Sequence, residues 1–469
     1  MNPLPDPFRP SPPMNPDALQ AHAQPLIIIA RAAVDARGHW SCRTSPVALI
    51  LDQASGKVLS ITPASDLPPE LCRSDIPTIE RTDAVLLPGL INAHTHLDLT
   101  DIGPRPHDPA LGFMPWIDMV RRERPETDAA IAAAVRRGIS LSLAGGTVAV
   151  GDIAGAPRAT PSTLPFQTLA ESPIASVSYL EFFAIGNGLQ RGKEAITAAL
   201  ASSSSPSPHA RLGLQPHAPN TVALTGYEHA LALAASPRNI PLCTHLAESP
   251  EEREFIARAR GPQREFLESL GLWNDTLAAE VGRGLSPIEH LAPVLESARR
   301  QRTPFTAVHC NDVSDSDLDI LARCGTRVVY CPRASDYFAA PSHFGPHRYR
   351  EMLARGIPVA LGTDSIINLP AHAADPQTGS ISILDEMRHL HRRDATEPAT
   401  LLAMATLHGA SALDASPADC RLSPGSMPLA IIAVDVSRPQ SSSNADDPLS
   451  WVLSAESSPS WLWTRKNTV

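Results

Sequence analysis

The sequence predicts an α/β fold built around a (β/α)8 TIM barrel, with a smaller β-rich domain formed from both chain ends. Three observations support this prediction. Eight apolar strand-like runs lie between residues 84 and 364, helix-compatible segments follow most of them, and further β-like segments flank the whole region. Strands that alternate with helices form parallel sheets with helical crossovers, and eight such strands close into a barrel.

The eight barrel strands are expected at 84–94, 147–154, 174–183, 211–217, 240–246, 304–310, 327–332 and 357–364. Helical patterns are expected at 126–138, 221–235, 250–259, 314–324 and 380–394. An open, doubly wound sheet is the alternative. It is disfavoured because it usually needs fewer strands and because the chain shows no Gly-rich dinucleotide fingerprint.

The two chain ends carry β-like segments of their own. The first begins near residue 26 with "PLIIIARAAV" and "PVALILDQASGKVLSITPA", and "GSMPLAIIAVDVS" is its C-terminal counterpart. We therefore predict a disordered Pro-rich leader over residues 1–25, a composite β-domain from residues 26–83 and 415–469, and a barrel over residues 84–414.

Composition narrows the class of protein. The 469 residues carry a net charge of −10, so the basic footprint of a nucleic-acid-binding protein is missing. The seven cysteines are scattered without a CxxC pair, which indicates a reducing compartment. No apolar run approaches the roughly 20 residues that span a bilayer. We expect a cytoplasmic protein without nucleic-acid or membrane partners.

Polar residues stand where the predicted strands end. The stretch "VLLPGLINAHTHLDLT" leads an apolar strand into two histidines whose i, i+2 spacing puts both side chains on one face. The strand-end residues are His94, His96, His217, His245, His309 and Asp364. The C-terminal ends of barrel strands meet at one rim, and burying a polar group unpaired costs about 1–3 kcal/mol. Each residue alone could be a structural histidine or a turn; together they predict a metal site, because imidazole and carboxylate suit zinc and iron.

Five segments resemble signature segments of the amidohydrolase superfamily: "PGLINAHTHLD", "LQPHAPNT", "THLAESPEE", "VHC" and "ALGTDS". The similarity is closest to its cytosine-deaminase-like branch, which holds methylthioadenosine/S-adenosylhomocysteine deaminases, aminofutalosine deaminases and triazine hydrolases. It covers roughly residues 26–436, and it implies a β-sandwich built from both chain ends. The motifs are specific for the superfamily and only weakly specific for substrate.

The resemblance also implies roles for individual residues. It makes His94, His96, His245 and Asp364 the metal ligands. Glu248, three residues after His245, would shuttle protons, and His309 would work beside Asp364 to orient the attacking water or to polarise the substrate. His217 would touch the substrate.

The expected cofactor is one divalent metal ion, Zn²⁺ or alternatively Fe²⁺. Two-metal members of the superfamily usually bridge their ions with a carboxylated lysine at the end of the fourth strand, where this chain has His217. Lys193, the one lysine between residues 58 and 465, stands at a predicted helix start. Glu181, which ends the third strand, could bridge a second ion or could be a salt-bridged barrel residue.

Residues of two loops are candidates for contact with the substrate. Trp116 and Phe113 lie in "FMPWIDMVRRER", which resembles a segment of aminofutalosine-deaminase-like proteins, and they could stack a planar heterocycle or pack on the rim. Arg333 and Ser335 lie in "CPRASDYF", where Asp336 replaces the asparagine common in the family.

We predict a metal-dependent aminohydrolase, a deaminase of an amino-substituted N-heterocycle such as aminofutalosine or a methylthioadenosine-like nucleoside. The alternative enzyme expels chloride, an alkylamine or an amide nitrogen by the same chemistry. A catalytically idle scaffold is a third hypothesis, disfavoured because such proteins typically lose ligands. The resemblance also suggests a homo-oligomer that binds a small-molecule substrate.

Overall fold

The computed structural model describes residues 25–41, 45–203, 207, 209–235, 239–436 and 447–465. Within these ranges the strands form two sheets, one of eight strands and one of seven. The predicted disordered leader, residues 1–25, lies outside the described residues except for Pro25, which begins the first strand.

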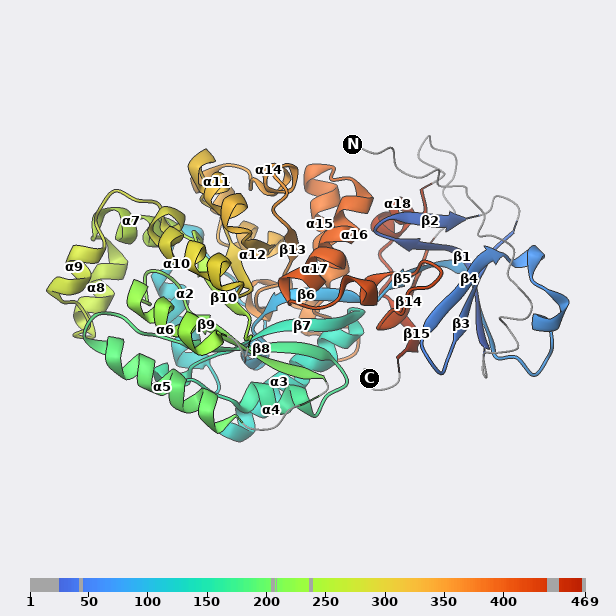
Figure 1. Cartoon of the computed structure of the whole chain (residues 1–469), viewed down its shortest axis with the longest axis horizontal. Helices are drawn as coiled ribbons and strands as arrows, with labels where there is room; N and C mark the ends of the chain where they lie inside the picture. The colour runs from blue at the N-terminus through green and yellow to red at the C-terminus, as the bar shows by residue number, and fades with distance from the viewer. Residues whose placement is uncertain are drawn as a thin grey trace.

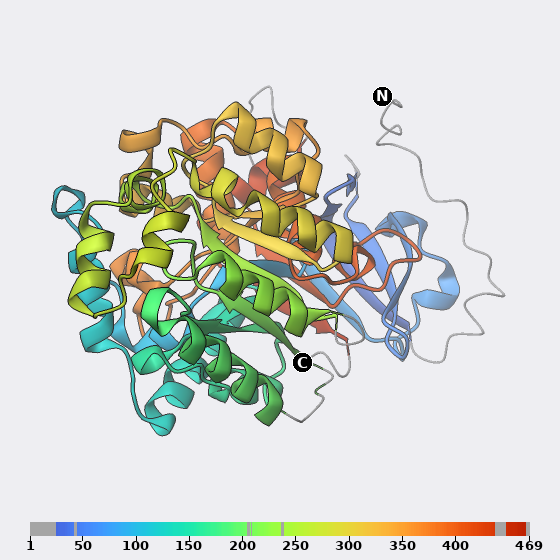
Figure 2. The ribbon, with the colours of Figure 1, turned by 60° about the vertical axis from the view of Figure 1, so that its left-hand side comes forward.

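The eight-stranded sheet is the predicted barrel. Its strands are β6 (Leu90–Thr95), β7 (Thr147–Ala154), β8 (Ala175–Phe182), β9 (Ala210–Pro216), β10 (Leu242–Leu246), β11 (Phe305–His309), β12 (Arg327–Tyr330) and β13 (Val359–Leu361). They pair in parallel and in sequence order, and a bridge between Thr95 and Asp364 closes the sheet on itself. The backbone N–H of His96 donates to Asp364 O at 2.8 Å across the same junction. The (β/α)8 fold is therefore confirmed, with helices around the strands (Figure 2).

The first predicted strand, 84–94, is two strands. Residues up to Pro88 belong to β5 (Thr78–Pro88) of the other sheet, and β6 begins at Leu90. Gly89 lies between them, where an added Cβ would approach Val148 Cβ to 2.8 Å. The continuous apolar run hid this division, because residues 84–88 of β5 and all of β6 are buried and neither stretch shows alternation. The domain limits at 83/84 and 414/415 stay a prediction.

The seven-stranded sheet joins the two ends of the chain. It consists of β1 (Pro25–Asp35), β2 (Gly38–Ser41), β3 (Val47–Asp52), β4 (Lys57–Pro63), β5, β14 (Ala430–Asp435) and β15 (Ser460–Thr464). The strand order is β15-β14-β5-β1-β3-β4, with β2 on β1. The antiparallel pairing of β14 with β5 brings the C-terminal segment beside the N-terminal one (Figure 1). All seven strands are hydrogen-bonded into one sheet, so segments from both chain ends share a second sheet besides that of the barrel.

Helices connect and cover the barrel strands. They are α2 (Met114–Glu123), α3 (Asp128–Ala144), α4 (Leu164–Ala170), α5 (Leu189–Ser202), α6 (Leu224–Ala234), α7 (Pro250–Arg258), α8 (Pro262–Ser269), α9 (Asp275–Glu280), α10 (Pro287–Gln301), α11 (Asp315–Cys324), α12 (Pro332–Tyr337), α13 (Ala340–Phe344), α14 (Tyr349–Ala354), α15 (Ile383–Asp394), α16 (Pro398–Ala405), α17 (Leu407–Ala412) and α18 (Pro448–Ser454). Local sequence explains several boundaries. Ser286 and Glu289 form a capping box that starts α10, and Gly325 ends α11 in the left-handed conformation.

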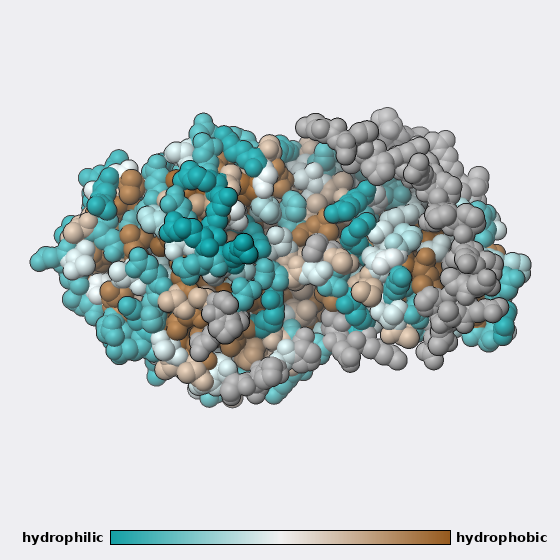
Figure 3. All heavy atoms as spheres, in the orientation of Figure 1, coloured by the Kyte–Doolittle hydropathy of each residue, from teal (hydrophilic) through white to brown (hydrophobic). Residues whose placement is uncertain are grey.

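The main core lies between the outside of the barrel wall and the helices that cover it. Leu214 and Leu242 from the strands pack there in one cluster with Tyr227 from α6 and Leu291 from α10. On the face drawn in Figure 3, hydrophilic side chains predominate and hydrophobic residues form separate small patches. In the described part of the chain, no helix combines the length and apolar character that crossing a membrane requires.

Candidate metal centre and active site

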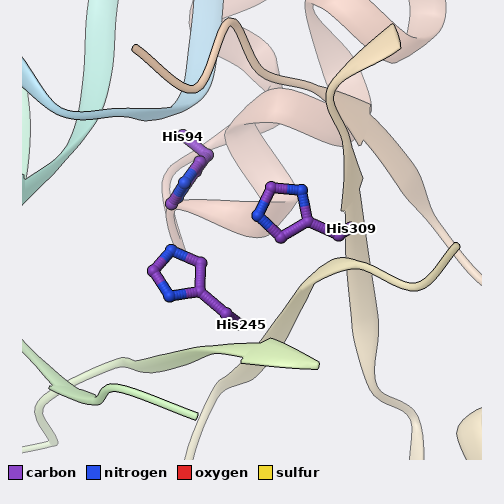
Figure 4. A group of neighbouring side chains, drawn as sticks. All are labelled: His94, His245 and His309. Atoms are coloured by element: carbon purple, nitrogen blue, oxygen red, sulfur yellow. The ribbon is translucent and has the colours of Figure 1, made fainter. Parts of the chain in front are cut away.

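Three predicted histidines meet at the C-terminal rim of the barrel. His94 lies near the end of β6, His245 near the end of β10, and His309 ends β11. Their ring centroids are 5.2 Å apart for His94 and His245, 5.4 Å for His245 and His309, and 5.7 Å for His94 and His309. Figure 4 shows the three rings around a common space. One nitrogen from each ring lies within 4.8 Å of the others, a spacing compatible with a metal ion.

A second group shares His94 and adds His96 and Asp364. The Asp364 Oδ1 atom lies 3.6 Å from His94 Nε2 and 3.5 Å from His96 Nε2. These three residues also offer ligand atoms within 4.8 Å of one another. The predicted convergence of strand-end residues is therefore present in the fold, although β6, β10 and the segment after β13 are far apart in sequence.

The chemistry of these side chains fits a divalent cation. Burial holds the pKa of His94 down to about 3 and lowers those of His96 and His245 well below the ordinary value, so the rings are neutral, which is the metal-binding form. His94 Nε2 and His96 Nδ1 are buried without a hydrogen-bond partner among the described residues. A bound cation would satisfy lone pairs that otherwise cost about 1–3 kcal/mol each to bury.

Glu248 stands beside this cluster. It follows β10, and its Oε1 atom lies 3.4 Å from His309 Nε2. The loop that carries it is held by Glu252 of α7, whose carboxylate accepts hydrogen bonds from the backbone N–H groups of Ala247 (3.1 Å) and Glu248 (2.7 Å). Burial raises the pKa of Glu248 well above its ordinary value, and nearby Asp364 adds to the effect. Glu252 was not among the site residues predicted from sequence, although Ser249 and Glu252 have the spacing of a helix start.

The backbone is strained at the rim. His309, Asp364 and Ala247 have φ values of 73°, 61° and 53°, in the left-handed region that non-glycine residues rarely adopt. Such conformations cost about 1–3 kcal/mol each and cluster at functional sites. The surrounding fold therefore stabilises a local geometry that the residues would not adopt alone.

His217 and Glu181 lie next to the histidine cluster. The His217 ring centroid is 5.0 Å from that of His245, and His217 Nε2 lies 3.9 Å from Glu181 Oε1. Glu181 Oε2 accepts a hydrogen bond from Ala156 N at 3.0 Å and lies 3.7 Å from Arg124 Nη1. Glu181 is absent from both metal-compatible groups of the described residues. This arrangement favours the salt-bridged interpretation of Glu181 over a second-metal bridge.

A buried ion-pair network beside the site was not predicted from sequence. Arg124, which follows α2, places Nε 2.9 Å from Asp98 Oδ2 and lies between Asp98 and Glu181. Asp98 and Glu181 are 4% and 3% exposed at their side chains. Gly155 leaves the space that the Arg124 guanidinium fills. Because Arg124 directly follows α2, these ion pairs hold the end of that helix to the barrel.

Replacing Gly155 with Ala is expected to lower the free energy of unfolding by about 3 kcal/mol, because the added methyl group displaces Arg124 and leaves two buried carboxylates poorly paired. Urea denaturation measures the effect. Gly38→Ala is the matched control, since no atom lies within 4 Å of the added methyl group there. Equal stability of the two variants would contradict the role assigned to Gly155.

A cavity of about 270 Å³ opens beside Glu248. Phe113, Phe338 and His107 contribute rings to its wall, and Glu251 joins them. Trp116 does not line this cavity. It packs behind it, with its ring centroid 5.3 Å from that of Phe113 and 5.2 Å from that of Phe338. Of the two aromatic residues predicted to stack a substrate, the structure brings Phe113 to the cavity and gives Trp116 a supporting position.

The structure does not bring Arg333 to the cavity. Its Nε donates to Glu386 Oε1 at 2.6 Å and its Nη2 to Ser382 O at 3.1 Å, and the side chain is 11% exposed. The guanidinium is turned toward α15, an arrangement that favours a structural role for Arg333 over the predicted substrate contact. Ser335 is buried in α12 and is likewise absent from the cavity wall. The sequence prediction placed both residues in a loop, whereas they lie in α12, and it could not give their side-chain directions.

We expect Arg333→Ala to lower the free energy of unfolding by about 3–5 kcal/mol, because it leaves the Glu386 carboxylate buried without its cation. The KM of the folded enzyme should change little. The double variant Arg333→Met with Glu386→Leu should recover most of the stability, since apolar residues of similar volume tolerate burial. A large rise in KM without loss of stability would restore the substrate-contact interpretation.

Residues 85–418 match the amidohydrolase family. The match covers the barrel and every residue of the histidine and carboxylate cluster. The chain belongs to the amidohydrolase family. The resemblance seen in the signature segments is thereby confirmed at the level of the family.

Several characterised relatives are similar to this amidohydrolase. An aminodeoxyfutalosine deaminase of Deinococcus radiodurans is 31% identical over 299 residues, which are 61% of this chain and 65% of that one. A 5-methylthioadenosine/S-adenosylhomocysteine deaminase of Syntrophobacter fumaroxidans is 25% identical over 401 residues, 82% of this chain and 79% of the relative. The matched stretch thus spans just under two thirds of the Deinococcus protein.

Solved structures support the fold. The Helicobacter pylori aminofutalosine deaminase in complex with methylthio-coformycin aligns with a TM-score of 0.68 at 20% identity, over 92% of this chain and 97% of that one. A Xanthomonas campestris adenosine deaminase with bound zinc aligns with a TM-score of 0.65 at 19% identity, over 94% and 91% of the two chains.

Proposed function

We propose that this amidohydrolase is a metal-dependent deaminase that hydrolyses the exocyclic amine of an adenine-type nucleoside or a related N-heterocycle. The observation that carries the proposal is the meeting of two metal-compatible groups with Glu248 at the rim of an aromatic-walled cavity. The names of the similar deaminases support the reaction and the substrate class.

In this proposal His94, His96, His245 and Asp364 hold one divalent ion, Zn²⁺ in preference to Fe²⁺. When bound, such an ion acts as a Lewis acid that makes a water molecule acidic enough to supply hydroxide near neutral pH. Neutral imidazoles and a carboxylate are the ligands that zinc prefers. One ion is expected because Glu181, which could have bridged a second, is paired with Arg124.

The chain's own residues then move protons. Glu248 accepts a proton from the attacking water and delivers it to a ring nitrogen of the substrate, which requires one carboxylate within reach of both groups. His309, 3.4 Å from Glu248, and Asp364 orient the water toward the carbon that bears the amine. Water adds to that carbon, Glu248 then transfers the second proton of the added water to the amine, and the carbon–nitrogen bond breaks to release ammonia.

The cavity supports a planar substrate. Phe113 and Phe338 present rings within it, and offset or edge-to-face contacts with aromatic rings stabilise flat heterocycles. We assign His217 to the substrate side of the cluster, since it lies beside His245 and outside both metal-compatible groups of the described residues.

We also propose, from the family resemblance, that the protein acts in the cytoplasm as a homo-oligomer. Size-exclusion chromatography of the purified protein tests the oligomeric state.

The test combines metal analysis with a deamination screen of the purified full chain. The panel contains aminodeoxyfutalosine, methylthioadenosine, S-adenosylhomocysteine, adenosine, guanine and cytosine, with chloro- and alkylamino-triazines for other leaving groups. About one metal ion per chain and ammonia release from an adenine nucleoside are the expected results. Release of chloride or alkylamine alone would replace the deaminase proposal with the hydrolase alternative, and metal-free protein after metal-replete expression would overturn it.

A further inference from the structure

His347 occupies a buried position behind the candidate site. It lies between α13 and α14 and is 9% exposed. Its ring stacks on Tyr330, with 3.7 Å between the centroids and 16° between the planes. The Tyr330 hydroxyl in turn accepts a hydrogen bond from Arg393 at 2.9 Å. The ring is therefore held on one face by an anchored aromatic residue.

The hydrogen bonds of His347 define its tautomer. The backbone N–H of Tyr349 lies 3.0 Å from His347 Nδ1, and a backbone N–H can only donate. His347 Nδ1 is therefore the unprotonated acceptor. His347 Nε2 lies 2.8 Å from the backbone oxygen of His309, which can only accept, so Nε2 carries the proton and donates it. A neutral imidazole with this one tautomer satisfies both partners.

The carbonyl that His347 binds belongs to a strained turn. The N–H of Cys310 is shared between Leu246 O of β10 at 3.0 Å and Val308 O at 3.2 Å. His309, between Val308 and Cys310, has φ of 73°, so the second bond has the geometry of a γ-turn with positive φ at its centre. The pairing of β11 with β12 ends at Val308, one residue earlier. β10 still pairs with His309, but the His309 carbonyl lies beyond the pairing with β12, and His347 supplies a hydrogen bond to it.

We propose that His347 is a positioning residue: its Nε2–H holds the His309 backbone in the γ-turn that directs the His309 imidazole toward Glu248. This inference rests on the role given to His309 in the proposed function. Among the described residues His347 belongs to neither metal-compatible group and does not line the cavity; its contact with the site is the hydrogen bond to the His309 backbone oxygen. It acts through the backbone of the residue that faces the site.

Two variants separate the hydrogen bonds from the packing. His347→Phe keeps a ring to stack on Tyr330 and removes both hydrogen bonds, whereas His347→Gln keeps a donor and an acceptor and loses the ring. We expect His347→Phe to lower kcat by about ten- to a hundredfold with less than about a twofold change in KM, because small displacements of a catalytic group have effects of this size. His347→Gln should recover most of kcat.

His408→Ala is the matched control. His408 is another largely buried histidine, whose Nδ1 lies 3.0 Å from the backbone oxygen of Val359 at the start of β13, the end of the strand opposite the site. It should lower thermal stability about as much as His347→Phe while leaving kcat unchanged. Equal kcat values for His347→Phe and the wild type, or equal losses of kcat in His347→Phe and His408→Ala, would overturn the proposal.

The absorption spectrum of the Co²⁺-substituted protein provides a readout without turnover. His347→Phe should shift the visible bands, because the ring of His309, a member of one metal-compatible group, is released. His347→Gln and His408→Ala should retain the wild-type spectrum. If the wild type deaminates none of the panel, the proposed function fails on that result alone. The spectra then decide the positioning role, and identical spectra for His347→Phe and wild type would refute it.

Discussion

Replacing Glu248 with Gln is expected to lower kcat for deamination by about a thousandfold while the metal content stays at the wild-type value. The amide cannot accept a proton from water, and general acid–base groups contribute about 10²–10⁴ to the rate. Metal binding should persist, because Glu248 belongs to neither metal-compatible group of the described residues. Ammonia release and metal analysis on the same preparation measure both quantities.

Glu254→Gln is the control for this variant. Glu254 lies on α7, six residues further along, and its carboxylate pairs with Arg260 at 3.0 Å on the surface. The same chemical change there should leave kcat and metal content unaltered. Turnover of Glu248→Gln near the wild-type value would remove the proton-transfer role from this carboxylate and with it the mechanism proposed above.

Replacing His94 with Ala is expected to abolish metal binding and to lower activity by more than about a thousandfold, since the ion supplies the nucleophile. His94 is the residue common to both metal-compatible groups, so its loss disrupts each of them. The apo protein should also be less stable. Metal present at about a thousand times its Kd stabilises a folded protein by about 4 kcal/mol, so chelation of the wild type should lower its thermal midpoint.

His290→Ala controls for the loss of a buried histidine. His290 is 4% exposed within α10, where its Nε2 atom lies 3.7 Å from Glu280 Oε1. This variant should lose stability and keep both metal and activity. A His94→Ala protein that retains one ion per chain and normal turnover would show that the cluster at the rim is not the metal centre.

Sequence patterns predicted the barrel and the strand-end residues because both depend on short, continuous segments of the chain. Each of the eight strands is a short apolar run, and seven of them appear in the structure close to their predicted limits. The period and length of such runs reflect burial on both faces. Because parallel strands place their C-terminal ends at one rim, the positions of His94, His245 and His309 follow from strand order alone.

Other features depend on contacts that the linear pattern does not encode. The division of the first strand at Gly89 follows from the approach of Val148, and the residues immediately on either side of Gly89 are all buried. Trp116 has the same residue type whether it lines a cavity or packs behind Phe113, and its position is set by Phe338, far along the chain. Phe113 reaches the cavity wall because its backbone N–H is held by Glu251 at 3.0 Å.

The sequence by itself therefore determined the barrel, its order of strands and the edge at which imidazoles and carboxylates gather. The tertiary structure alone decided side-chain direction: Arg333 toward Glu386, Arg124 between Asp98 and Glu181, and His347 against the His309 carbonyl. The physical reason is the range of the forces involved. The burial of a strand requires apolar residues at successive positions, so it can be recognised in the sequence. A hydrogen bond or an ion pair depends instead on the distance and angle between atoms that only folding brings together.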